Sequence, residues 1–263
     1  MIARLGDREI LSYRYSPEAP KTYIHPLTTP NGVVVTEDSP EDHRHHRGLF
    51  LGWSRVNGYD FWGEFGEENQ GWIVQTHWDG LSTNDWVRWT VRLRWRAGGR
   101  TLLNERRSLA ATVWDRGLFL EWTSVLSAPA EMVVLDASQH PYNGLGIRFV
   151  REMTKGDVLH SDGTSAIQEA NGRSGEWCSY FREMDKDRVV GAALFSHPSS
   201  ARHPCPFFVM NDPFGFISAA PTFHEPLTIA TGQFVSLKFG IFVYDGVAEK
   251  ERLNGVYQRW VGT

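Results

Sequence analysis

Cysteine is scarce in this sequence, which contains only Cys178 and Cys205. The two residues do not form a Cys-x-x-Cys pair, so they define neither a disulfide framework nor a zinc knuckle. Reduced thiols are typical of proteins from reducing compartments. We therefore expect a cytoplasmic protein.

Long apolar runs are missing as well. No stretch approaches the roughly 18 uncharged apolar residues that a membrane helix needs. The segment from Met1 to Asp7 lacks the apolar region of a secretory signal. The formal net charge is -4 and the isoelectric point is about 6.2, so no excess of positive charge favours nucleic acid or an anionic membrane. We expect neither of these as a partner.

Several enzyme signatures are also absent. The sequence has no phosphate-binding glycine loop, no Gly-x-Ser-x-Gly elbow and no His-Glu-x-x-His helix. Nucleotide-binding, serine-hydrolase and zinc-protease functions therefore have no support. Tryptophan, in contrast, is abundant, with 11 residues in 263. Its side chain stacks on sugar-like ligands in clefts, although buried tryptophans also simply fill cores.

Strict alternation of apolar and polar residues is the dominant pattern. Between Val87 and Arg96, apolar residues fall on one face and arginines on most positions of the other, which predicts a strand with one buried face. We interpret the arginine row as a solvated face. Residues 97–100 predict a hairpin turn, residues 101–114 a return strand, and the segment from Leu118 to Thr123 a third strand of a meander.

Shorter strand candidates recur along the chain with Gly and Pro between them. They are Glu9–Tyr15, Gly32–Val35, Gly48–Trp53, Trp72–Trp78, Met132–Leu135, Leu145–Val150, Val189–Phe195, Phe207–Met210, Phe214–Ser218 and Phe234–Tyr244. This spacing predicts an all-β antiparallel sandwich, a single domain over residues 1–263. Helical spacing of apolar residues predicts a short C-terminal helix, with Asp245 as its cap, that buries Leu253, Val256, Tyr257 and Trp260.

The segment from Asp42 to Gly48 contains three of the ten histidines, His43, His45 and His46. Imidazole suits proton transfer near neutral pH and metal ligation. On an extended backbone, His43 and His45 would point one way and His46 the other, so at most two would face one pocket. The His-x-His spacing resembles cupin metal sites, but the carboxylate that those sites need is missing from positions 48–50. A metal site would need a distant third ligand such as His140 or His197.

Other segments supply further candidates. After the turn at Asn57, an aromatic wall of Tyr59, Phe61 and Trp62 precedes Glu64, while Asp60 is expected to be structural. A polar loop over residues 195–204 offers ligand-binding or catalytic groups on a rigid scaffold. The remaining candidates are one arginine in an apolar strand, two residues of that loop and one late-chain carboxylate, namely Arg148, His197, Arg202 and Glu225.

Six blocks in order along the chain resemble a bacterial family that is labelled PmoA-like, or a domain of unknown function. They are Tyr23–Gly32, Val35–Leu49, Val56–Glu64, Gly144–Phe149, Ser196–Pro206 and Glu225–Thr228. The label implies a membrane subunit of a copper enzyme, which the missing membrane helices contradict. The family is similar in architecture to galactose-mutarotase-like β-supersandwiches, which bind sugars in a cleft on one sheet. Because mutarotases use a His acid and a late-chain Glu base, the resemblance implies these roles for His43, His45 or His197 and for Glu225.

These observations predict a carbohydrate-processing enzyme that acts at a sugar carbonyl or anomeric centre, as an epimerase, mutarotase or lyase. The expected catalytic residues are His43, His45, His46, His197 and Glu225; the expected substrate-binding residues are Arg47, Trp62, Glu64, Arg148 and Arg202. The expected partner is a small-molecule carbohydrate, with no cofactor and no metal. Two alternatives stay open: a metal-dependent, His-ligated enzyme and a non-catalytic carbohydrate-binding protein. It also stays open which sugar is bound, which bond is changed and whether the chain forms a homodimer.

Overall fold

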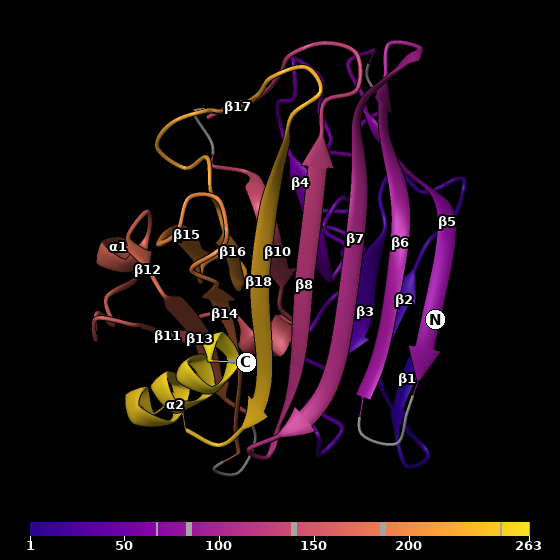
Figure 1. Ribbon diagram of the computed structural model, residues 1–263. Helices are drawn as coiled ribbons and strands as arrows, with labels where there is room; N and C mark the ends of the chain where they lie inside the picture. Colours follow the sequence, from indigo (N-terminus) through magenta and orange to yellow (C-terminus); the bar gives the residue numbers. More distant parts are fainter. Residues whose placement is uncertain (67, 83–85, 138–140, 185–187, 248, 263) are drawn as a thin grey trace.

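The computed structural model describes residues 1–66, 68–82, 86–137, 141–184, 188–247 and 249–262. In this part of the chain, two antiparallel eight-stranded sheets lie face to face as two layers (Figure 1). The all-β sandwich expected from the sequence is therefore confirmed. A short two-stranded ladder of β9 (Val133–Leu135) and β17 (Leu227–Ile229) lies beside them.

The first sheet combines four strands from the N-terminal part of the chain with four strands that lie between residues 143 and 219. In spatial order they are β1 (Ile2–Leu5), β2 (Arg8–Arg14), β3 (Tyr23–Leu27), β4 (Leu49–Trp53), β10 (Asn143–Arg148), β16 (Phe216–Ala219), β15 (Cys205–Met210) and β12 (Ser174–Gly175). The second sheet has the longer strands. In spatial order they are β11 (Asp157–His160), β13 (Trp177–Glu183), β14 (Val189–Ser196), β18 (Phe234–Asp245), β8 (Gly117–Ser127), β7 (Arg100–Trp114), β6 (Trp86–Ala97) and β5 (Trp72–Ser82).

The predicted meander forms the middle of the second sheet. Strand β6 pairs with β7, and β7 pairs with β8. The alternation in β6 is confirmed, because Trp89, Val91, Leu93 and Trp95 are buried while Arg88, Arg92, Arg94 and Arg96 are exposed. The strand predicted over residues 32–35 is wrong, because these residues form only an isolated bridge from Val34 to Thr28. Strands β1, β3, β11, β12 and β13 were not predicted.

The main core lies between the two sheets, and the period-two rule divides each strand of the first sheet between this core and the outer face. In β4, Leu49, Leu51 and Trp53 belong to the core between the sheets, whereas Phe50 belongs to a separate aromatic cluster. Strands β15 and β16 of the same sheet follow this rule and add Phe208 and Phe216 to that cluster. The outer face of the first sheet is therefore aromatic.

Helix α2 (Lys250–Val261) covers the outer face of the second sheet, where Figure 1 shows it in yellow. The four residues that predicted this helix are all buried, and they pack against Phe119, Phe195 and Phe242. The predicted cap is wrong: the N-cap is Glu249, because Asp245 still belongs to β18 and accepts a hydrogen bond from Thr29. The other helical segments are α1 (Ile167–Ala170) and the 3₁₀ turn Arg151–Met153.

One charged pair lies inside the sandwich. Arg107 and Glu105, both on β7, are fully buried and form a two-point ion pair with distances of 2.7 and 2.9 Å. The third guanidinium contact crosses to the other layer, where Arg107 donates to the Thr22 hydroxyl at 2.7 Å. Trp95 and Ser124 complete the hydrogen bonding of Glu105, as a buried carboxylate requires.

No helix among the described residues is both long enough and apolar enough to span a lipid bilayer.

Candidate functional site

A cavity of about 310 Å³ opens on the aromatic outer face of the first sheet. This volume is at the lower end of the range for small-molecule sites. Its wall combines the three clustered histidines with aromatic side chains and a few polar groups: His43, His45, His46, Ser54, Asp60, Trp62, Gly63, Phe65, Tyr142, Phe208, Met210, Phe214 and Phe216. We call it the inner cavity.

All three histidines of the cluster face this inner cavity. The segment is not extended but turned, with the His46 N–H donating to the His43 carbonyl at 2.9 Å. The turn brings the three ring centroids within 4.5–5.6 Å of one another. The expectation that at most two rings would share a pocket applied to an extended segment, and this segment is not extended. The turn ends at Gly48, whose φ is +66° and where a Cβ would collide with the Ile24 carbonyl.

Arg148 organises the histidine cluster from β10. Its side chain is only 4% exposed, lies over the Phe214 ring at 4.0 Å and reaches the turned segment. One guanidinium nitrogen lies 3.2 Å from Nδ1 of His46, and another donates to the Asp42 carboxylate at 3.0 and 3.1 Å. Glu37 lies 3.3 Å from the same group. Arg148 therefore contacts the turned segment and does not line the cavity, and its expected ligand-binding role stays a prediction.

These contacts determine where the imidazole protons lie. A guanidinium can only donate, so Nδ1 of His46 accepts from Arg148 and the neutral ring carries its proton on Nε2. Asp42 lies 3.1 Å from Nδ1 of His43. A carboxylate accepts, so this nitrogen of His43 carries a proton, and in the neutral form of the ring Nε2 keeps its lone pair. The two rings are nearly parallel, with centroids 4.9 Å apart. In their neutral forms, Nε2 of His43 can accept a hydrogen bond and Nε2 of His46 can donate one.

Burial keeps two of the rings neutral. It lowers the pKa of His46 to about 2, with further lowering by His45 and Arg148. It lowers the pKa of His45 to about 4, with Lys21 and His43 adding to the effect. For Asp42, burial raises the pKa, but hydrogen bonds from Arg148 and His43 outweigh it and leave the pKa below its usual value. Near pH 7, the cavity therefore presents neutral imidazoles beside an ionised carboxylate.

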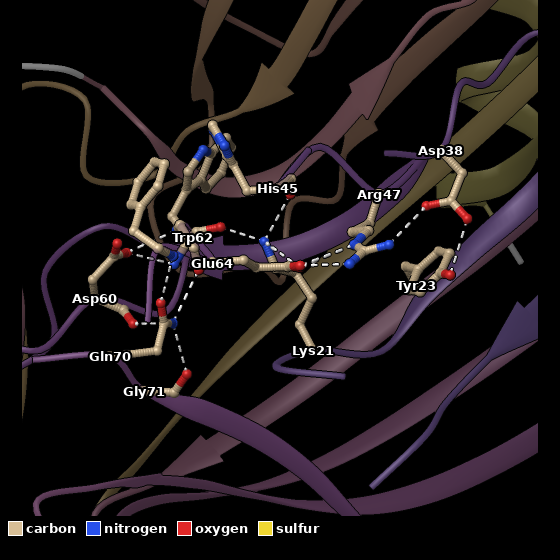
Figure 2. Close-up of polar contacts among 12 residues, drawn as sticks. Lys21, Tyr23, Asp38, His45, Arg47, Asp60, Trp62, Glu64, Gln70 and Gly71 are labelled. Carbon is tan, nitrogen blue, oxygen red and sulfur yellow. Dashed lines mark hydrogen bonds and ion pairs between the residues drawn. The ribbon is translucent and has the colours of Figure 1, made fainter. Parts of the chain in front are cut away.

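A group of charged residues holds the two segments of the wall together (Figure 2). Lys21 donates to the carbonyls of His45, at 3.0 Å, and of Trp62, and lies 3.4 Å from Glu64. Arg47 forms a two-point ion pair with Glu64, with a closest distance of 2.6 Å. We call Lys21, Arg47 and Glu64 the clamp. Arg47 and Glu64 thus bind one another and support the wall, and their expected contact with a substrate stays a prediction.

The pKa values of two clamp residues, Lys21 and Arg47, are shifted in opposite directions. Burial lowers the pKa of Lys21 to about 8, against the opposing effect of Glu64. The hydrogen bonds to Glu64 raise the pKa of Arg47 further above its usual value. Arg47 also lies 3.5 Å from Asp38, which accepts a hydrogen bond from Tyr23 at 3.0 Å. The network thus extends to β3.

The segment after Asn57 contributes fewer aromatic residues than expected. Only Trp62 of the predicted aromatic wall lines the cavity, since Phe61 packs in the core against Trp95 and Tyr59 packs at its edge. Asp60 accepts hydrogen bonds from the backbone of Trp62 and Gly63 at 2.7 and 2.9 Å, as a structural turn residue does. The buried Nε1 of Trp62 has no hydrogen-bond partner among the described residues, so it can donate to a ligand.

Three predicted site residues lie elsewhere, and the expected grouping is corrected accordingly. His197 follows β14 of the second sheet, contacts Ser199 at 2.7 Å and packs its ring on Trp260 of α2. Arg202 and Glu225 form an ion pair in another cavity, with His203 and His224 in its wall. The reason is topological. His197 follows a strand of the second sheet, and Arg202 and Glu225 line a different cavity, so these loops do not reach the turn of the histidine cluster.

A family model describes this chain over nearly its whole length. The match, to DUF6807, covers residues 3–258. The chain belongs to this family of unknown function. A comparison with curated proteins finds no match.

Solved structures share a distant similarity with this DUF6807 protein. An α-galactosidase from Lactobacillus brevis has 12% identity and a TM-score of 0.49, covering 95% of this chain and 40% of that chain. A galactose mutarotase related enzyme from Lactobacillus acidophilus has 8% identity and a TM-score of 0.37, covering 89% and 97%. An aldose epimerase homologue from C. elegans has 11% identity and a TM-score of 0.40, covering 91% and 100%. The DUF6807 chain thus spans less than half of the α-galactosidase, and similarities this distant carry no argument about activity.

The metal-dependent alternative finds no support in the described part of the DUF6807 chain. No group of three or more His, Cys, Asp or Glu side chains there has an arrangement that could hold a metal ion. His197, proposed as a third ligand, lies in a different place, and His140 falls outside the described residues.

Sequence reasoning missed several residues of the site. The aromatic residues Phe208, Phe214 and Phe216 could have been found, since 208 and 216 follow the alternation of their strands. Asp42 was visible beside the histidines but was not assigned a role. Lys21 gave no signal, because an isolated lysine between Pro20 and Thr22 is ordinarily a solvated surface residue.

Proposed function

We propose that this protein is a carbohydrate-processing enzyme that uses His43 and His46 for acid–base chemistry at a sugar carbonyl or anomeric centre. The observation that carries the proposal is the pair of nearly parallel imidazoles with opposite hydrogen-bonding character in one aromatic cavity. A proton acceptor beside a proton donor is the arrangement that epimerisation, mutarotation and elimination require.

The aromatic part of the wall suits a sugar ring. Trp62 and Tyr142 stack at 5.8 Å with an interplanar angle of 15°, and Phe208 and Phe216 extend this surface over the first sheet. Flat apolar side chains of this kind pack on the C–H face of a sugar, while a few polar groups orient its hydroxyls. Such groups are Ser54, Asp60 and the N–H of Trp62, of which the Trp62 N–H has no partner among the described residues.

The roles of the two histidines follow from their partners. His43 Nε2 takes a proton from the sugar, either from a hydroxyl or from a carbon next to a carbonyl, and Asp42 stabilises the imidazolium that forms. His46 donates a hydrogen bond from Nε2 to the oxygen on which negative charge develops, while Arg148 keeps Nδ1 as the acceptor. The His43 imidazolium then returns its proton to the product, so both rings end neutral. A positioned base of this kind contributes roughly 10²–10⁴-fold to the rate.

This proposal differs from the mutarotase-like roles that the sequence resemblance implied. Glu225 is paired with Arg202 and does not line the inner cavity, so Asp42 and His43 replace it as the base in our proposal. The PmoA-like label adds no chemistry to it.

The test is hydrogen exchange and turnover with a panel of aldoses and keto-sugars, followed by NMR in D₂O. We expect His43→Gln to slow deuterium incorporation at least about 100-fold, and Asp42→Asn to slow it less. His77→Gln, a change at an exposed histidine on β5, serves as the matched control. Unchanged exchange in both His43→Gln and His46→Gln would exclude the mechanism. Sugar binding without conversion by the unmodified protein would favour a non-catalytic carbohydrate-binding function.

A further inference from the structure

A second pocket adjoins the inner cavity. It has a volume of about 440 Å³ and is lined by Asp42, His43, Arg44, His45, Glu64 and Phe65. We call it the outer pocket. Three of these residues, His43, His45 and Phe65, also line the inner cavity. The two spaces therefore meet at the histidine cluster.

The two spaces differ in chemical character. The inner cavity is walled mainly by buried aromatic residues, whereas the outer pocket is bordered by charged groups and is more open to solvent. Two of its charged residues are already paired, since Asp42 binds Arg148 and Glu64 belongs to the clamp. Arg44 is exposed and has no hydrogen bond or ion pair with other residues in the described ranges.

Phe65 marks the border between the two spaces. It is 65% exposed, and its ring lies 5.0 Å from that of His45. A largely exposed phenylalanine contributes little to the free energy of folding, because most of its apolar surface stays in water. Beside an open pocket, the same ring offers a surface on which a second flat group can pack.

We propose that the inner cavity and the outer pocket are adjoining subsites for one extended ligand, a glycoside or short oligosaccharide. This inference rests on the proposed function and specifies its substrate class. One sugar ring occupies the inner cavity, and the second unit packs on Phe65 with its hydroxyls toward Arg44. The imidazoles of His43 and His45 then stand beside the junction of the two units. A free monosaccharide fills only the inner cavity.

Isothermal titration calorimetry on the full chain tests this arrangement. The probes are glucose and galactose, their 4-nitrophenyl β-glycosides, cellobiose and lactose. We expect a two-unit probe to bind roughly three- to tenfold more tightly than the sugar of its inner unit, as one added aromatic stacking contact predicts. Arg44→Ala should weaken two-unit probes and leave the free sugar unchanged, whereas Arg94→Ala, at an exposed arginine of β6, should affect neither.

The outcomes separate this inference from the proposed function. If free sugars bind as tightly as two-unit probes, or if Arg44→Ala weakens both equally, the outer subsite is rejected while the sugar site stands. If no probe binds, the proposed function fails and the inference fails with it. A Phe65→Ala variant gives a second reading, since it should weaken two-unit probes more than free sugars.

Discussion

The ammonium group of Lys21 lies 3.4 Å from the carboxylate of Glu64, although Lys21 is only 1% exposed. This buried contact joins the segment before β3 to the segment before β5, and hydrogen bonds to the carbonyls of His45 and Trp62 fix both sides of the inner cavity. The geometry of the histidine cluster therefore depends on a lysine that does not itself line the cavity.

The Lys21→Met variant should be destabilised by about 3 kcal/mol, because loss of one partner leaves the other charge of a buried pair uncompensated. Arg47 still binds Glu64, which limits the loss. Urea unfolding followed by tryptophan fluorescence measures the change. Lys250→Met, at the start of α2, should stay within about 0.5 kcal/mol of the unmodified protein. Equal effects of the two substitutions would show that the clamp does not stabilise the fold.

Acid should destabilise the protein through His45 and His46. Unfolded histidines titrate near pH 6.5, but in the folded state burial lowers the pKa of His45 to about 4 and that of His46 to about 2. Between pH 6.5 and 4, the unfolded chain thus binds more protons than the folded chain. The stabilisation is complete above pH 6.5 and is lost as the pH falls.

The measurement is the free energy of unfolding at several pH values between 7.5 and 4.5. His45→Gln should reduce the slope of stability against pH by about one proton, and His77→Gln, an exposed position on β5, should leave the slope unchanged. A slope in His45→Gln that equals that of the unmodified protein would mean that His45 titrates normally in the folded state.

Arg148 should act on activity through the residues that it holds. Arg148→Lys keeps the charge but loses the planar group that contacts His46 and Asp42 together. We expect roughly 10- to 100-fold lower kcat, the loss that small misplacements of catalytic groups cause, with a smaller change in KM. In Arg148→Met, kcat should fall further than in Arg148→Lys, because no donor then keeps Nδ1 of His46 as the acceptor. Equal losses of kcat in the two variants, each matched by a loss of folding stability, would indicate a purely structural role.

The Glu225→Gln substitution should leave turnover within about twofold of that of the unmodified protein, since Glu225 pairs with Arg202 and does not line the inner cavity. The comparison is steady-state kinetics on the same sugar as for His43→Gln. A loss of turnover as large as that of His43→Gln would indicate that Glu225 is the base. It would reject the proposal that His43, supported by Asp42, is the base.

The sequence predicted those features that local patterns determine. Alternation between Val87 and Arg96 was sufficient for β6, because burial of one strand face leaves a direct trace in the residue order. The histidine cluster was recognisable because its members are adjacent. The turn that brings the three rings together could not be recognised. Arg148, which contacts this turn, lies 102 residues from His46 in the chain. Glu225 was a candidate as a late-chain carboxylate and by the family resemblance, but its ion pair with Arg202 could not be seen in the sequence.

The buried pair of Arg107 and Glu105 has a consequence for the evolution of this protein. Arg107 reaches Thr22, the neighbour of Lys21, so an interior charge of one layer fixes the chain next to the clamp of the other. Apolar residues of similar volume often replace a buried ion pair with a gain in stability. Such an exchange would free Thr22 and loosen the wall behind the histidines. Selection for a fixed geometry of the histidine cluster and selection for thermal stability would therefore act on these interior positions in opposite directions.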